Sequence, residues 1–99
     1  MNDYVETIAE SVPLDDLLAQ LAEECAEVGH AALKLRRART GTNPTPVTGE
    51  QAFEKLEEEI SDLHTVLTVL GVCGISGISS VYNAKLKRWA GRVNGGNLA

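Results

Sequence analysis

Five acidic residues form two short groups whose spacing suits metal binding: Glu23, Glu24 and Glu27 in one, Glu59 and Asp62 in the other. At about 100° per residue, each group covers one flank of a helix, beside a stripe of apolar residues. If the two stripes pack together, four or five carboxylates converge at one seam. There they repel one another and lose hydration. A hard divalent cation that takes oxygen ligands, Mg²⁺ or Mn²⁺, removes this penalty.

Solvated helix faces are the alternative explanation of these acidic residues, because charged side chains are mostly exposed in folded proteins. A single glutamate-rich group would favour that explanation. Two groups, each at the edge of an apolar stripe, favour a metal site.

Two amphipathic helices must position these carboxylates. In residues 14–38 apolar side chains recur at spacings of three and four, which is typical of a helix that buries one face. The stripe is Leu14, Leu17, Leu18, Leu21, Cys25, Val28, Ala32 and Leu35. Residues 50–70 carry a second stripe of Phe53, Leu56, Ile60, Leu63, Leu67 and Leu70.

Capping residues are expected before both helices. Ser11 is a plausible N-cap for the first helix, since serine accepts a hydrogen bond from the first free backbone N–H groups. Thr48 and Gln51 have the spacing of a capping box for the second. The Thr-, Pro- and Gly-rich segment 40–49 is the expected loop between them.

A third helix is expected over residues 78–93, before Gly95 and Gly96 end it. It would bury Ile78, Tyr82, Leu86, Trp89 and Val93. Near the N-terminus, Tyr4, Val5 and Ile8 predict a short docking helix.

The fold class predicted from these elements is all-α, in one domain spanning residues 1–99. Its centre is the helical hairpin 14–38/50–70, with the third helix added to it. Few aromatic residues and thin apolar stripes leave one chain unable to cover its own apolar surface. We therefore expect a homodimer with a four-helix-bundle core, or a tetramer of such chains.

Composition excludes several classes of protein. The net charge of −5 argues against binding to a nucleic-acid backbone, which needs a basic face. No apolar run is long enough to span a membrane and no export signal is present, so we expect a cytoplasmic protein. Cys25 and Cys73 lie in apolar runs at a spacing that fits no zinc or redox motif, and we expect buried, reduced thiols.

The acidic groups also resemble a known signature. Residues 23–27 read EExxE and residues 59–62 read ExxD. In this order on two helices they are similar to the motif of the all-α nucleoside triphosphate pyrophosphohydrolases, the MazG-like superfamily. The resemblance extends from about Leu17 to Trp89, and the basic helix end near residues 34–37 and the run 83–89 are similar to small phage-type members.

The resemblance implies a Mg²⁺-dependent enzyme that cleaves a nucleoside triphosphate to a monophosphate and pyrophosphate. It implies that the metal ligands are Glu24, Glu27, Glu59 and Asp62. Glu23 would act in catalysis, by helping to hold a further ion or by orienting the attacking water.

Substrate-binding residues are expected among the lysines and one asparagine. Lys34 lies on the same flank as Glu27 and could reach a phosphate, although a C-terminal lysine also complements the helix dipole. On the third helix, Lys85 is the main phosphate-binding candidate, and the resemblance favours Asn83 as a further substrate-binding residue. Lone histidines are usually structural, so neither His30 nor His64 is assigned to catalysis.

Two other functions compete with this prediction. A phosphoribosyl-ATP pyrophosphohydrolase of histidine synthesis has similar acidic motifs, but its usual lysine pair before the glutamates is replaced here by Gln20, Leu21 and Ala22. A non-catalytic helical module that dimerises or binds partners is the second alternative. The intact set of acidic residues argues against it.

Overall fold

The computed structural model of the chain describes residues 3–41, 46–75 and 81–95. Within these ranges it contains α-helices and no strand, as the all-α prediction requires. The helices are α1 (Asp3–Ser11), α2 (Leu14–Thr40), α3 (Gly49–Val72) and α4 (Val81–Val93). None of the described helices is both long and apolar enough to cross a membrane.

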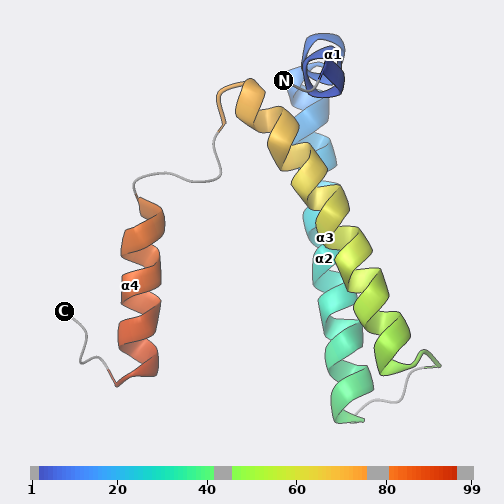
Figure 1. Cartoon of the computed structure of the whole chain (residues 1–99), viewed down its shortest axis with the longest axis vertical. Coiled ribbons are helices and arrows are strands. Elements are labelled where there is room, and N and C mark those ends of the chain that lie inside the picture. The colour runs from blue at the N-terminus through green and yellow to red at the C-terminus, as the bar shows by residue number, and fades with distance from the viewer. Residues whose placement is uncertain (1–2, 42–45, 76–80, 96–99) are drawn as a thin grey trace.

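The long helices α2 and α3 pack side by side as an antiparallel hairpin, and α1 lies across the end of the hairpin farthest from the turn (Figure 1). The apolar core is at this end. Leu17 from α2 and Val66, Val69 and Leu70 from α3 are buried there, and side chains of α1 pack onto them. The predicted hairpin and docking helix are both confirmed.

Local signals explain where the long helices begin and end. At the start of α3, Thr48 Oγ1 accepts a hydrogen bond from the backbone N–H of Gln51, and Gln51 Oε1 accepts one from the N–H of Thr48, both at 3.0 Å. The predicted capping box is therefore confirmed. Helix α2 ends at Gly41, whose left-handed backbone (φ +67°) lets its N–H bond the carbonyl of Arg37.

The predicted cap at Ser11 is wrong. Ser11 is the last residue of α1, and Pro13 precedes α2 without a side-chain cap. The fixed φ of proline suits this position, and its carbonyl accepts the N–H groups of Asp16 and Leu17.

The buried face of each long helix differs from the apolar stripe seen in the sequence. The buried residues of α2 are Leu17, Glu24 and Ala31, and those of α3 include Ala52, Glu59 and Val66. Both sets repeat every seven residues, as in a coiled-coil seam. By helix geometry, each contact face is rotated by roughly 60° from the centre of its stripe toward the acidic residues.

This rotation leaves apolar side chains exposed on the flank opposite the acids. On α3, Phe53 is 52% exposed and Ile60 48% exposed, and Leu67 is exposed on the same flank. On α2, Leu14 and Leu18 are exposed. Because the helices are antiparallel and both contact faces rotate in the same sense, the two exposed sets lie on one face of the hairpin. We call it the apolar face.

Two expectations of burial are wrong for the single chain. Cys25 and Cys73 are free but exposed. Cys25 follows Glu24, which takes the buried position, and Cys73 lies beyond the last turn of α3.

The third predicted helix is present as α4, and the predicted start at residue 78 lies outside the described residues. Its apolar residues Tyr82, Leu86, Trp89 and Val93 are exposed, contrary to expectation, with Trp89 63% exposed. The reason is that α4 makes no extended contact with another described helix and lies apart from the hairpin (Figure 1).

Replacement of Thr48 by alanine tests the role of the capping box. Thr48→Ala removes the oxygen that satisfies an N-terminal backbone N–H of α3, so the free energy of unfolding should fall by about 1 kcal/mol. Urea denaturation followed by circular dichroism measures the change. Thr68→Ala is the control, because that hydroxyl bonds a carbonyl within the helix. Equal effects of the two substitutions would contradict a capping role for Thr48.

Candidate metal centre

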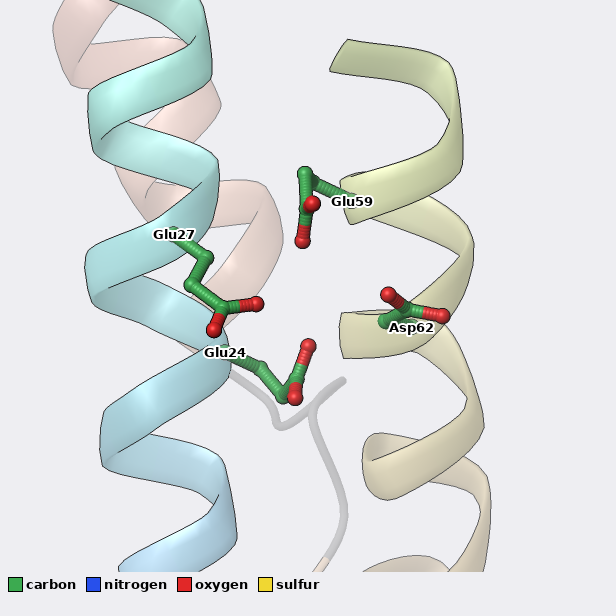
Figure 2. A group of neighbouring side chains, drawn as sticks. All are labelled: Glu24, Glu27, Glu59 and Asp62. Atoms are coloured by element: carbon green, nitrogen blue, oxygen red, sulfur yellow. The ribbon is translucent and has the colours of Figure 1, made fainter. Parts of the chain in front are cut away.

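Four of the predicted site residues meet between α2 and α3. Glu24 and Glu27 extend from α2 and Glu59 and Asp62 from α3, and their carboxylates face one another across the seam (Figure 2). One oxygen from each of the four lies within 4.8 Å of the others. The EExxE and ExxD groups are therefore brought together, as their spacing predicted.

Two of the four carboxylates are buried. Glu24 is 8% exposed and Glu59 is 6% exposed, since both lie at seam positions of the hairpin. Glu27 and Asp62, by contrast, are exposed and open the cluster to solvent. The cluster therefore has a closed inner side and an accessible outer side.

Each buried carboxylate has a protein partner for one oxygen only. Gln20 Nε2 donates a hydrogen bond to Glu24 Oε1 at 2.9 Å. Lys55 Nζ forms an ion pair with Glu59 Oε1 at 2.8 Å. The second oxygens, Glu24 Oε2 and Glu59 Oε2, are buried without a hydrogen-bond partner. An unsatisfied buried carboxylate oxygen is costly, so these atoms could serve as ligands of a cation.

The pKa values of the cluster reflect this crowding. The pKa of Glu27 is raised, first because the neighbouring Glu59 carboxylate would accept a hydrogen bond from the protonated form of Glu27, and then because the negative charges of Glu24 and Glu59 disfavour its ionised form. The pKa of Glu59 is lowered, first by its interaction with Lys55 and then by the hydrogen bond that a protonated Glu27 would donate to it. The cluster therefore resists carrying its full negative charge, which a bound cation would neutralise.

The donor set fits a divalent cation. All four side chains offer oxygen, the ligand that Mg²⁺, Mn²⁺ and Ca²⁺ prefer. Oxygens around a single Mg²⁺, at about 2.1 Å from the ion, lie about 3–4 Å from one another. One oxygen of each carboxylate already lies within 4.8 Å of the others, which is close to this separation.

The sequence did not single out two of the residues that contact the cluster. Lys55 lies one turn before Glu59 on α3 and carries the cation nearest to the buried acids. The i,i+4 spacing of a lysine and a glutamate was the available signal. Gln20 lies one turn before Glu24 at the same spacing.

Lys34 lies close to the cluster, on the side toward the hairpin turn. It lines a small pocket of about 170 Å³ together with Glu27, His30, Lys55 and Glu59. This pocket gathers basic side chains beside the carboxylates, and His30, expected to be structural, is among them.

Other candidates lie away from the four carboxylates. Glu23 is exposed on α2 outside the group, although its charge adds to those that raise the pKa of Glu27. Asn83 and Lys85 are on α4, which the single chain does not bring to the cluster.

Comparisons of the chain with family models, with curated proteins and with solved structures found no match. The resemblance to the all-α pyrophosphohydrolases therefore stays a prediction from the two acidic motifs.

The raised pKa of Glu27 gives a testable link between pH and stability. A folded-state pKa above the ordinary value of 4.5 means that the folded protein holds this proton more tightly than the unfolded chain. That contribution to stability is present below pH 4.5 and is lost as the pH rises through the raised pKa. In chelator at pH 7, Glu27→Gln should therefore melt at a higher temperature than wild type, and the difference should shrink toward pH 4.

Glu57→Gln removes an exposed charge from α3 outside the cluster and serves as the control. Thermal melts of the three proteins across this pH range measure the effect. A Glu27→Gln protein that melts below wild type at pH 7 would show that the carboxylates are not crowded.

Proposed function

We propose that this chain is a Mg²⁺-dependent nucleotide pyrophosphohydrolase of the MazG-like type, which cleaves a nucleoside triphosphate to a monophosphate and pyrophosphate. The observation that carries the proposal is the group of four carboxylates with two buried, unpartnered oxygens. Structural salt bridges would have satisfied those oxygens with cationic side chains, as Lys55 satisfies one oxygen of Glu59. The EExxE and ExxD motifs supply the reaction class.

In this proposal Glu24, Glu27, Glu59 and Asp62 hold the metal. Bound there, Mg²⁺ would neutralise phosphate charge and make water a better nucleophile. Glu23, exposed beside the cluster, would orient that water and accept its proton. Water would add to the α-phosphorus as the anhydride bond between the α- and β-phosphates breaks, and pyrophosphate would leave.

The basic pocket beside the cluster would supply positive charge to the leaving pyrophosphate. Lys34 and Lys55 line it, and their ammonium groups would bind pyrophosphate oxygens by charge-assisted hydrogen bonds. Further cations come from α4, which carries Lys85, Lys87, Arg88 and Arg92 and no acidic residue. If α4 docked against the acidic flank of the α2–α3 hairpin, Asn83 and Lys85 would lie near the phosphates.

A second copy of the chain is the proposed partner. The apolar face of the hairpin exposes several large apolar side chains, and pairing two such faces would form the four-helix bundle expected from the sequence. The acidic seam lies on the opposite flank and would stay accessible in such a dimer.

Metal-dependent turnover is the first expected outcome. Pyrophosphate release from nucleoside triphosphates should require Mg²⁺ or Mn²⁺, and Glu24→Gln or Asp62→Asn should lower kcat by orders of magnitude while circular dichroism stays helical. Glu57→Gln should leave kcat unchanged. Undiminished turnover in excess chelator would overturn the metal assignment. Mg²⁺ binding by calorimetry without turnover of any nucleotide would favour a non-catalytic module.

Self-association is the second expected outcome. Sedimentation equilibrium at micromolar concentration should give at least twice the chain mass, because exposed apolar side chains gain about 25 cal/mol per Å² when covered. Phe53→Glu places a charge on the apolar face and should shift the protein toward the monomer. Ala19→Glu adds the same charge to an exposed site on the far side of α2 and should not. A wild-type mass of one chain would contradict the dimer.

A further inference from the structure

A second, larger pocket adjoins the carboxylates on the side away from the hairpin turn. It has a volume of about 390 Å³, within the range of small-molecule sites, and lies where α1 crosses the hairpin. Glu24 and Asp62, two of the proposed metal ligands, form part of its wall. The rest of the wall is mainly apolar and comes from Ile8, Val12, Leu17, Val66 and Val69.

The two pockets on either side of the carboxylates differ in charge. Among the described residues no basic side chain lines the larger pocket, whereas Lys34 and Lys55 line the smaller pocket on the other side of the carboxylates. A molecule with an anionic end and a flat apolar end would therefore bind in one orientation, with its phosphates over the metal and the basic pocket. Its base would enter the larger pocket, about 6 Å along α2 from Glu24, at Gln20.

The polar atoms of the larger pocket are mostly hydrogen-bond acceptors. The Asp16 carboxylate lines it, and no hydrogen bond or ion pair engages that carboxylate among the described residues. Thr65 Oγ1 donates its hydrogen to the carbonyl of Ser61 at 2.9 Å, so it faces a ligand as an acceptor. Gln20 uses one amide hydrogen on Glu24, which leaves its carbonyl oxygen and one N–H.

We propose that this pocket selects guanine, so that the substrate is a guanine nucleoside triphosphate and Asp16 is its specificity-determining residue. Guanine presents two adjacent N–H donors, N1–H and N2–H, which match the two oxygens of one carboxylate. Its neighbouring 6-carbonyl oxygen suits the remaining N–H of Gln20. Adenine and cytosine place a ring acceptor beside their amino group, and uracil and thymine have one N–H between two carbonyls. The assignment of a triphosphate as the substrate rests on the proposed function.

Inosine nucleotides provide the matched probe, because hypoxanthine lacks only the 2-amino group of guanine. Wild-type kcat/KM should be about tenfold or more higher for GTP than for ITP or ATP, as expected for one well-formed pair of hydrogen bonds. Asp16→Asn should abolish the preference for GTP over ITP. The same substitution should also raise kcat/KM for ATP relative to that for GTP, because an amide offers an acceptor for the 6-amino group of adenine and a donor for its N1.

Asp15→Asn is the control. It removes the same charge from the same first turn of α2 but lies outside the pocket wall. Its preference for GTP should equal that of wild type. Equal kcat/KM for GTP and ITP in wild type, or an unchanged preference in Asp16→Asn, would overturn the assignment of guanine while leaving the hydrolase proposal standing.

Binding of the monophosphates separates this inference from the reaction itself. With Mg²⁺ present, calorimetry should give a lower Kd for GMP than for IMP or AMP, and Asp16→Asn should remove the difference. If no triphosphate is cleaved yet GMP still binds more tightly than IMP, the proposed reaction fails and the guanine pocket holds. If GMP binds no more tightly than IMP, the guanine pocket fails whatever the turnover.

Discussion

The contact between α2 and α3 is arranged around two glutamates that occupy positions where a coiled coil would carry apolar residues. Glu24 lies between Leu17 and Ala31 at intervals of seven residues, and Glu59 lies likewise between Ala52 and Val66. Burying two carboxylates in one seam is unfavourable unless their charges are balanced. Lys55 balances the charge of Glu59 in part, and Gln20 donates a hydrogen bond to Glu24. The packing of α2 on α3 and the capacity to hold a cation are thus properties of the same residues.

Local patterns in the sequence predicted much of this arrangement. The 3.6-residue periodicity predicted the hairpin, and the Thr48–Gln51 pair predicted the start of α3. The convergence of the EExxE and ExxD groups also followed from sequence, since both groups lie beside apolar stripes that were expected to pack together. These features depend on local hydrogen bonds and helix geometry, which short segments determine.

The rotation of the helices could not be predicted in the same way. A hydrophobic stripe defines a contact face on the assumption that charged residues avoid it, and here Glu24 and Glu59 lie in the contact. Cys25 therefore became exposed although it lies in the centre of its stripe. The exposure of Trp89 has a different origin, because α4 makes no extended contact with another described helix. Periodicity identifies an apolar face but not what covers it.

The use of core positions for the carboxylates has a consequence for how such a chain would change over generations. A substitution such as Glu59→Leu fills the seam with a residue that packs well, and replacing buried charges by apolar groups is often neutral or stabilising. A lineage released from selection for activity would thus drift toward leucine or valine at positions 24 and 59 and keep a sound, more stable hairpin. If positions 24 and 59 serve the proposed metal site, acids kept there would reflect selection on chemistry, because folding alone does not require them.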